Sequence, residues 1–289
     1  MKYAYYPGCA LHATAIEFDK STREVCVALD IELQEMEDWN CCGAAAAHMT
    51  NELLADSLPA KNLAIASKMG LDITSPCAIC INRLKTANKE INESQEIKEK
   101  VSQVIEESYD GQVKARLLLD ILATDIGIDK IKENVIKELK NLKVVSYYGC
   151  LVTRPKDVAQ FDNVEDPQSM DNLMAATGAK AIDWPFKTVC CGADYGTPRT
   201  DIVLKMANDI LSMAKDLGAD TIAVTCPLCQ MNLELRQKDV EKEYGEIYNM
   251  PILYFTEVLG LSFGIEPKAL GLDKHIVDAM GLLMRKGLI

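Results

Sequence analysis

The stretch KYAYYPGC at residues 2–9 returns in the second half of the chain as KVVSYYGC at residues 143–150. In both copies, a short run with aromatic and β-branched residues leads to a glycine and then a cysteine. This pattern is typical of a strand that ends in a tight turn. Its recurrence indicates that one structural unit occurs twice in this chain.

The repeat continues beyond these strands. Each later segment carries cysteines at matching places: first a Cys-Cys-Gly motif with a tryptophan before it, and then a CxxC motif. Chance does not distribute cysteines in this way, so the sequence indicates a duplicated metal-binding or redox unit. The matching segments are IELQEMEDWNCCG (31–43) with AKAIDWPFKTVCCG (179–192), and ASKMGLDITSPCAIC (66–80) with AKDLGADTIAVTCPLC (214–229).

Amphipathic helices are expected between the strands. Apolar residues recur at helical spacing over residues 12–29, 51–69 and 200–217. Gly70 and Gly218 follow two of these segments, in the position after a helix that favours glycine. An apolar strand comes next, with a CxxC motif just past its end. Each half therefore reads strand–helix–strand–helix–strand–helix, the order of a parallel α/β layer.

The predicted fold is an α/β protein made of two pseudo-symmetric repeats, each a small parallel sheet flanked by helices. A helical connector over 81–141, with an apolar-faced helix at 117–127, is expected to pack on the first half, and the tail beyond 251 is expected to be helical. The first domain covers 1–142 with the connector, and the second covers 143–289. Functional groups gather outside the carboxyl ends of parallel strands, where all the cysteine motifs fall.

Composition and charge narrow the class of protein. The 289 residues are 48% hydrophobic and 26% charged, as in a globular protein with a large core. A formal net charge of -12 argues against a nucleic-acid partner, which needs a basic surface. The N-terminus has no signal-peptide core and no apolar run spans a bilayer, so we expect a cytoplasmic protein without membrane insertion. Thiols are reduced in that compartment, which favours metal-binding or catalytic cysteines over disulfides.

Ten of the eleven cysteines form two sets of five. The interval between the Cys-Cys pair and the CxxC motif is 34 residues in both sets, and the interval before the pair is 31 residues in one and 39 in the other. A zinc ion and an ordinary 4Fe–4S cubane each take four ligands. Five thiolates therefore favour an iron–sulfur cluster of unusual shape, or four ligands plus one free redox-active thiol. The eleventh cysteine, Cys26, falls on the apolar side of a helix and is expected to be buried.

This layout, Cys-x31–39-Cys-Cys-Gly-x33-Cys-x-x-Cys present twice, resembles the cysteine-rich CCG domain of the heterodisulfide reductase B subunits of methanogenic archaea. Similar domains occur in iron–sulfur subunits of glycolate, lactate, glycerol-3-phosphate and succinate oxidoreductases. The resemblance covers nearly the whole chain and implies one non-cubane 4Fe–4S cluster per domain, each held by five cysteines. The implied ligands are Cys9, Cys41, Cys42, Cys77 and Cys80 for one cluster, and Cys150, Cys190, Cys191, Cys226 and Cys229 for the other.

The resemblance also implies an activity and partners. The expected reaction is the two-electron cleavage of the mixed disulfide of coenzyme M and coenzyme B to two thiols, a step of methanogenesis. Electrons would come from a ferredoxin-like C subunit fed by a flavin-containing, electron-bifurcating A subunit, with a hydrogenase or formate dehydrogenase upstream. Two alternatives stay open. One is an iron–sulfur electron-transfer subunit of one of the related oxidoreductase complexes, with no substrate site of its own, and the other is a structural zinc protein.

A few other side chains are candidates for catalysis or substrate binding. A histidine close after a cysteine motif could protonate the departing thiolate, since imidazole titrates near neutral pH. His12 and His48 meet this condition, whereas His275 in the tail is given no role. The implied substrate carries a phosphate and a sulfonate, so basic residues near the cysteines are its candidate ligands: Arg83, Arg154, Lys187 and Arg199.

Overall fold

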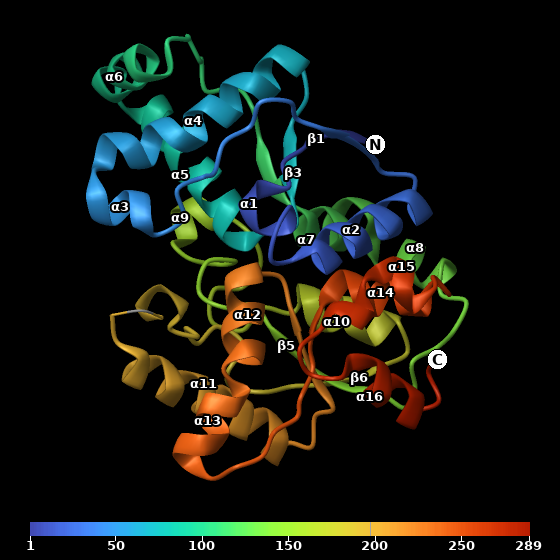
Figure 1. The fold of residues 1–289 in the computed structure, drawn as a ribbon. Helices are drawn as coiled ribbons and strands as arrows, with labels where there is room; N and C mark the ends of the chain where they lie inside the picture. The colour runs from blue at the N-terminus through green and yellow to red at the C-terminus, as the bar shows by residue number, and fades with distance from the viewer. Residues whose placement is uncertain (197) are drawn as a thin grey trace.

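Each half of the chain builds one four-stranded parallel sheet in the computed structural model, which describes residues 1–196 and 198–289. The strand order is β2-β1-β3-β4 in the first sheet and β6-β5-β7-β8 in the second, so the expected repeat of a parallel sheet is confirmed (Figure 1). The strands are β1 (Lys2–Tyr5), β2 (Glu32–Glu35), β3 (Ile73–Ser75), β4 (Ala115–Leu117), β5 (Lys143–Tyr147), β6 (Lys180–Ile182), β7 (Thr221–Val224) and β8 (Ile252–Tyr254).

Helices connect the strands and cover the sheets. The helix expected over 51–69 is α4, which is capped by the Asn51 side chain accepting from the Leu54 amide (3.0 Å) and ends at Gly70 with a left-handed backbone (φ +66°). The first half includes α1 (Gly8–Leu11), α2 (Ile16–Ala28), α3 (Ala46–Thr50), α4 (Glu52–Met69), α5 (Ala78–Glu93), α6 (Gln95–Ile105), α7 (Leu118–Ile121), the π-helix η1 (Leu122–Ile126) and α8 (Gly127–Glu133). The second half includes α9 (Lys156–Ala159), α10 (Ser169–Ala176), the 3-10 helix η2 (Ala193–Tyr195), α11 (Thr200–Asp216), α12 (Pro227–Leu235), α13 (Gln237–Tyr244), α14 (Phe255–Ser262), α15 (Pro267–Leu270), the 3-10 helix η3 (Leu272–Lys274) and α16 (Ala279–Arg285).

The strand order places a topological switch point in each sheet. In the first sheet β1 pairs with both β2 and β3, so the chain leaves β1 toward one edge and β3 toward the other. The carboxyl ends of these two strands therefore adjoin at the crevice where open α/β sheets bind ligands. Cys9 follows β1 and Cys77 follows β3, while Cys150 and Cys226 take the same places after β5 and β7.

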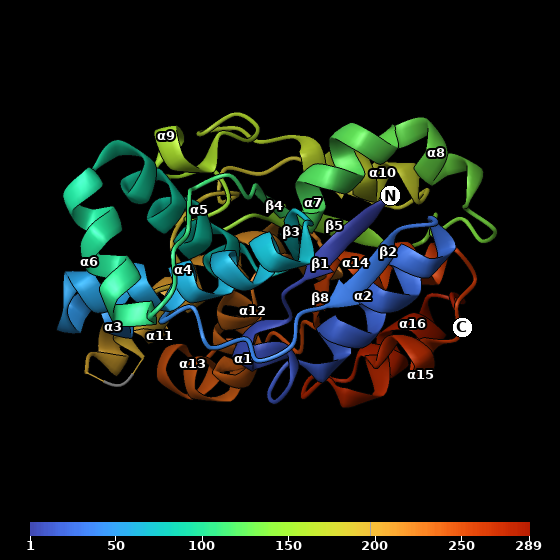
Figure 2. The same ribbon diagram turned by 90° about the horizontal axis from the view of Figure 1, so that it is seen from above.

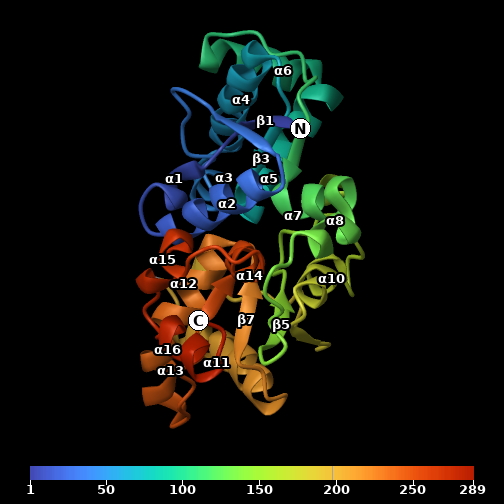
Figure 3. The same cartoon turned by 90° about the vertical axis from the view of Figure 1, so that its right-hand side faces the viewer.

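The two halves pack against one another reciprocally. Helix α2 of the first half contacts α14 and α15 of the second, while α10 of the second half contacts α7, η1 and α8 of the first (Figures 2 and 3). Mutual contacts of this kind arise when two equivalent units are related by a two-fold axis. The hydrophobic core continues across the interface, where the Phe18 ring stacks on Tyr254 with 3.9 Å between centroids.

The connector and the tail are mainly helical, and each also supplies one short strand. β4 lies in the connector and β8 in the tail, and each forms the sheet edge beside the third strand. Three residues carry too little alternation to identify a strand from sequence. The apolar segment 117–127 divides into α7, η1 and the start of α8 instead of one helix. Because α8 packs on α10, the connector contacts both halves and not the first alone.

Candidate functional site

The cysteines of both CxxC motifs lie at the start of a helix. Cys77 and Cys226 occupy the N-cap positions of α5 and α12, and Cys80 and Cys229 lie in the first turns of those helices. The positive end of the helix dipole favours thiolates there. All eleven cysteines are free thiols in this structure, so the ten expected ligands are available to bind a metal–sulfur group.

The sulfurs of each set approach one another in pairs. Two thiolates bound at about 2.3 Å to one tetrahedral metal atom lie about 3.8 Å apart, so sulfurs at nearly this separation need move little to share an atom. Among the described residues, no three His, Cys, Asp or Glu side chains converge as one metal ion requires. Sulfurs paired at this distance are spaced to share metal atoms. The pairs, each at 3.6 Å, are Cys9–Cys41, Cys42–Cys80 and Cys191–Cys229.

All five cysteines of the second set line one cavity. Its volume is about 30 Å³, room for a water molecule or two. Ala78 and Ile79, which belong to the CxxC motif of the first half, form part of its wall, together with Tyr148 and Asp194. The two cysteine sets are therefore neighbours, and the second set is completed by backbone and side chains from the other repeat.

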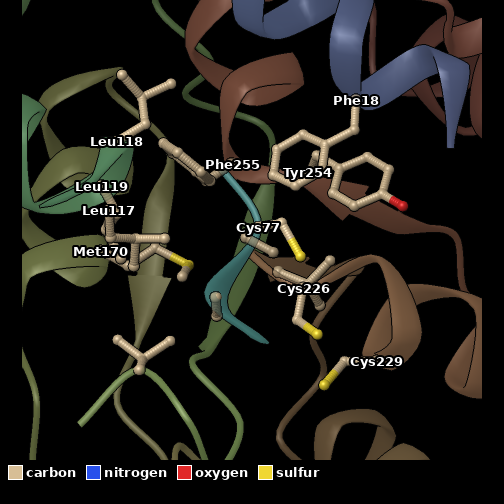
Figure 4. Close-up of a cluster of buried hydrophobic side chains, with 14 of the residues drawn as sticks. Phe18, Cys77, Leu117, Leu118, Leu119, Met170, Cys226, Cys229, Tyr254 and Phe255 are labelled. Atoms are coloured by element: carbon tan, nitrogen blue, oxygen red, sulfur yellow. The ribbon is translucent and has the colours of Figure 1, made fainter. Parts of the chain in front are cut away.

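Hydrogen bonds join the two CxxC loops directly. The Ala78 amide donates to the Thr225 carbonyl (3.2 Å), and the Thr225 hydroxyl donates to the Pro76 carbonyl (3.0 Å). Cys77 and Cys226 lie within one buried cluster of the core (Figure 4). The two candidate ligand sets are thus held at a fixed separation by backbone contacts and not only by side-chain packing.

Backbone amides donate to sulfurs in both halves. The Gly43 amide lies 3.4 Å from the Cys41 sulfur, and the Gly192 amide lies 3.3 Å from the Cys190 sulfur. Amide donors of this kind stabilise thiolates and raise the reduction potential of an iron–sulfur cluster that they hold. The glycine of each Cys-Cys-Gly motif therefore has a chemical role as well as a conformational one.

Neighbouring thiols concentrate negative charge on the first cysteine of each Cys-Cys pair. Hydrogen bonds from Cys42 and Cys9 lower the pKa of Cys41 to about 2. The corresponding bond from Cys150 lowers the pKa of Cys190 to about 6. One cysteine of each set is therefore a thiolate at neutral pH, which is the form that binds metals.

A tyrosine anchors each Cys-Cys pair in the same way. The Tyr6 hydroxyl donates to the Asn40 carbonyl (2.8 Å), and the Tyr147 hydroxyl donates to the Val189 carbonyl (2.6 Å). Each acceptor belongs to the residue directly before the pair. Both tyrosines are buried and close to the thiols, and burial is the main cause that raises their pKa well above its usual value. They act as neutral donors that fix the loop.

Two glycines allow a backbone segment to pass close to a sulfur. A Cβ built on Gly8 would lie 3.0 Å from the Cys80 sulfur, and one on Gly149 would lie 3.2 Å from the Cys229 sulfur. Both glycines also have a left-handed backbone, with φ of +68° and +69°. Ten free thiols, amide donors and these close approaches fit a metal–sulfur group in each half.

The two expected histidines lie on the first half. His12 follows α1, with its Nε2 3.2 Å from a Glu35 oxygen and its ring edge against Trp39 at a centroid distance of 5.2 Å. His48 lies exposed on α3, and partial burial together with the positive charge of Arg83 lowers its pKa. His48 thus lies close to Arg83, a candidate substrate ligand.

Arg83 is placed between the two cysteine sets. Its Nε donates to the Ala44 carbonyl (2.9 Å), directly beyond the first Cys-Cys-Gly motif. Burial lowers its pKa, while Cys42, Asp194 and Cys150 are close enough to oppose that shift. A guanidinium near thiols of both halves is well placed to bind an anionic ligand there.

Lys187 has a structural role in this fold. Its ammonium is buried and lies 2.8 Å from carboxylates of Asp166 and Asp183, and 3.7 Å from Asp171. The carboxylates of Asp166 and Asp183 and the Pro167 carbonyl (3.2 Å) occupy its three donors, so the ammonium is not free to bind a substrate. The expectation that it contacts the substrate is not supported by its position.

The other two expected basic residues also bind groups of the chain. Arg154 donates to the Thr188 carbonyl (3.1 Å) and to Glu165 (2.6 Å), and it is about one third exposed. Arg199 is exposed and pairs with Asp201 at 2.8 Å. Arg154 retains an accessible edge beside the second cysteine set, whereas Arg199 is a surface residue at the start of α11.

Sequence reasoning missed a charged residue of the cavity wall, Asp194. Asp194 places a carboxylate beside the second set that has no counterpart in the first. The signal was present as a break in the repeat, because CCGAD in the second copy stands where the first has CCGAA. Tyr148, from the second of the repeated tyrosine pairs, also lines the cavity, and its hydroxyl donates to Asp171 (2.7 Å).

A family model and several known proteins match this chain. The model described as "Cysteine-rich domain" (CCG) matches residues 3–85 and 144–234, so both repeats are covered. The chain belongs to the CCG cysteine-rich domain family. The crystal structure of a hypothetical protein from Helicobacter pylori has the same fold, with a TM-score of 0.74 over 96% of this chain at 14% identity. This chain spans about half, 52%, of that structure.

Relatives of this CCG protein include subunits of two kinds of complex. The 8-methylmenaquinol:fumarate reductase membrane anchor subunit of Wolinella succinogenes is 33% identical, over 97% of this chain and 99% of the relative. The B subunit of a ferredoxin/F(420)H(2)-dependent CoB-CoM heterodisulfide reductase of Methanosarcina acetivorans is 27% identical, over 98% of this chain and 96% of the relative. In the part of this chain that the structure describes, no helix is long and apolar enough to cross a membrane.

Proposed function

We propose that this chain is the catalytic subunit of a heterodisulfide reductase that cleaves the mixed disulfide of coenzyme M and coenzyme B. The reaction adds two electrons and two protons to the S–S bond and releases two thiols. The proposal rests on the closeness of the two cysteine sets. Ala78 and Ile79, from the CxxC motif of the first half, line the same cavity as the five thiols of the second half. A disulfide has two similar sulfurs, and a site built from two similar halves suits it.

The proposed cofactors are two non-cubane 4Fe–4S clusters, one in each CCG domain, at residues 1–142 and 143–289. When bound, such clusters supply single electrons. The chain holds them with five thiols each, orients two of those thiols with the Gly43 and Gly192 amides, and excludes water with buried tyrosines. The proposed ligands are Cys9, Cys41, Cys42, Cys77, Cys80, Cys150, Cys190, Cys191, Cys226 and Cys229.

Arg83 is the proposed contact for an anionic end of the substrate, because its guanidinium lies near thiols of both sets. Arg154 is a second candidate, on the side of the second set. His48 and His12 are the proposed proton donors to the departing thiolates. Lys187 is left out of this site because its ammonium is buried among carboxylates.

The proposed reaction needs an electron donor that the chain does not contain. Its sequence has no ferredoxin-type run of closely spaced cysteines, so electrons have to come from another protein. The proposed partners are a ferredoxin-like C subunit and a flavin-containing A subunit, with a hydrogenase or formate dehydrogenase upstream, in the cytoplasm. Relatives that are B subunits of heterodisulfide reductases support this assignment.

The test uses protein purified without oxygen. Iron and acid-labile sulfide should each amount to roughly eight atoms per chain, because two four-iron clusters are proposed. Addition of the mixed disulfide with an artificial one-electron donor should release two thiols per disulfide. Cys26→Ser is the matched control and should keep both contents, since Cys26 lies in the core outside either set. Zinc without sulfide would contradict the proposal.

A second candidate function is electron transfer without a substrate site. It is favoured by the 33% identical relative, which belongs to an 8-methylmenaquinol:fumarate reductase. In that case the loaded protein would exchange electrons with a one-electron donor and a quinone analogue but release no thiols from the disulfide. The thiol assay therefore separates the two functions on one preparation.

A further inference from the structure

A fully buried histidine links two glutamates near the second cysteine set. The His275 Nδ1 lies 3.1 and 3.2 Å from the two Glu234 oxygens, and its Nε2 lies 3.0 and 3.1 Å from those of Glu257. The side chains of these three residues are 0%, 2% and 0% exposed. Ionisable groups are rarely buried so completely unless they are paired, so this cluster is a built feature of the fold.

The cluster joins two helices of the second half, one of which begins at the second CxxC motif. Glu234 lies on α12, the helix that begins after Cys226, and Glu257 lies on α14. Glu257 accepts a hydrogen bond from the Tyr254 amide (2.7 Å), and the buried Tyr254 hydroxyl has no partner among the described residues. Tyr254 lies in the same buried core as Cys226 (Figure 4). Tyr254 on β8 is paired with Val224 on β7, two residues before Cys226, so Tyr254 and Glu257 lie beside the strand that leads to the second CxxC motif.

Glu234 is also reached from solvent. A cavity of about 390 Å³ has Glu234 in its wall, together with Gln237, Asn249, Asp278 and Arg285. This cavity is lined by a majority of polar groups and holds several water molecules by volume. A continuous series of titratable groups therefore runs from solvent through Glu234, His275 and Glu257 into the core.

The charges of the cluster favour proton uptake. The facing charged groups are Glu17 on α2, Glu234 on α12 and Glu257 on α14, with Tyr254 and Cys226 beyond. Burial alone would lower the pKa of His275, but the two glutamates hold it well above its usual value. Burial raises the pKa of Glu17. One imidazole faces three carboxyl groups here, so the cluster has sites for a further proton, and an electron added nearby makes the uptake of that proton more favourable.

We propose that Glu234, His275 and Glu257 form a proton-uptake path to the second cysteine set, which takes one proton from solvent for each electron that enters there. The proposal rests on the function proposed above, because it requires a redox group held by Cys226 and its set. The electron comes from the external one-electron donor and the proton from water in the cavity beside Glu234. The proton ends as an O–H of the carboxyl cluster, so charge at this end of the core stays constant.

The test is a redox titration of the loaded protein between about pH 6 and pH 8, followed by electron paramagnetic resonance. One proton per electron shifts the equilibrium tenfold per pH unit, which is about 59 mV per unit for a one-electron couple. We expect the reduction potential at the second cysteine set to change with pH at this slope in the wild-type protein. In H275Q and in E257Q we expect a slope near zero. The matched control is E241Q, which removes a carboxylate from the wall of the same cavity but outside the series, and should keep the wild-type slope.

A second readout follows the protons directly. Infrared difference spectra between oxidised and reduced wild-type protein should show a carboxyl group gaining a proton, and this band should be missing in E257Q. The wild-type titration decides the proposal even if a variant fails to fold, because a pH-independent potential at the second set would overturn it. A slope that persists in both variants would overturn it too.

Failure of this inference differs from failure of the proposed function. The protein could have full iron and sulfide and release thiols, while the reduction potential at the second cysteine set does not change with pH. That result contradicts only the proton path. Protein with the pH-dependent potential that releases no thiols contradicts only the disulfide reductase. Protein without iron and sulfide contradicts both.

Discussion

The substitution Gly8→Ala separates a metal-bound sulfur from an ordinary buried thiol. Gly8 precedes Cys9, and a Cβ at this position would lie 3.0 Å from the Cys80 sulfur. A free Cys80 side chain can rotate away by a few tenths of an ångström. A sulfur bound to metal cannot, because metal–ligand distances tolerate only about 0.2 Å. The added methyl group should therefore act on metal binding far more than on the apo fold.

The backbone cost can be subtracted with a matched glycine. Gly8 and Gly70 have nearly the same φ, +68° and +66°, and a Cβ on Gly70 would meet nothing within 4 Å. A left-handed backbone costs a non-glycine residue about 1 kcal/mol. That cost lowers the melting temperature of a chain of this size by about 2 °C. Both apo variants should show this loss, so any further difference between them comes from the sulfur contact.

The assay is iron and sulfide content after anaerobic loading. Gly70→Ala should keep roughly eight iron atoms per chain, and Gly8→Ala should fall toward roughly four because only the second set still binds. The second half offers an equivalent pair. Gly149→Ala should lower the iron content toward roughly four atoms because only the first set still binds, and its control Gly218→Ala should keep roughly eight. Full iron content in Gly8→Ala, at wild-type stability, would refute the assignment of Cys80 as a ligand.

Three further substitutions test the roles of single side chains. Arg83→Gln should raise the half-saturation constant for the disulfide about tenfold, the worth of one charge-assisted contact, without loss of iron. Lys187→Met should lower the free energy of unfolding by about 3 kcal/mol, because it removes the cation beside the buried Asp171 carboxylate, and should leave substrate affinity unchanged. For His275, the pKa is raised in the folded state, so its stabilising effect is present below about pH 6.5 and lost at higher pH. The free energy of unfolding should fall by about 1.4 kcal/mol per pH unit above that point, and His275→Gln should lack this slope.

Each of these measurements has its own control. Arg199→Gln removes an exposed arginine that pairs with Asp201 and should change neither affinity nor iron content. For Lys187→Met, urea unfolding measures the free energy of unfolding. A large rise in the half-saturation constant for the disulfide would show that Lys187 does contact the substrate. For His275, a wild-type stability that does not fall between about pH 7 and pH 9 would show that its imidazolium is not preferentially bound in the folded state.

Local sequence patterns were sufficient to predict the strands and helices in which several residues follow the same apolar periodicity. The strands before Cys9 and Cys150 and the helices at 52–69 and 200–216 follow from apolar periodicity and terminal glycines, and both appear in the structure. The strands β4 and β8 escaped notice because each is only three residues long, too short to show a distinct alternation. They are strands because an open sheet edge is available to them, which is a property of the neighbouring strand and not of their own residues.

Single polar side chains were harder to assign. Lys187 looked like a substrate ligand from its place before a cysteine pair, but its ammonium is enclosed by three aspartates, two of them from a different part of the chain. His275 looked unremarkable in the tail, yet it is bound on both ring nitrogens inside the core. A side chain's charge is visible in sequence, whereas its partners come from segments brought together by folding.

The sequence by itself determined that the chain is a duplicated α/β unit with five cysteines at the strand ends of each copy, because motif spacing and periodicity are local properties. Only the tertiary structure decided how the two copies meet. It joined the CxxC loops through Thr225, bound Arg83 to the loop after the first Cys-Cys-Gly motif, and buried the Glu234–His275–Glu257 series in the second half. The physical reason is that contacts between repeats depend on which buried faces fit together across the two-fold interface, and no stretch of either repeat encodes that alone.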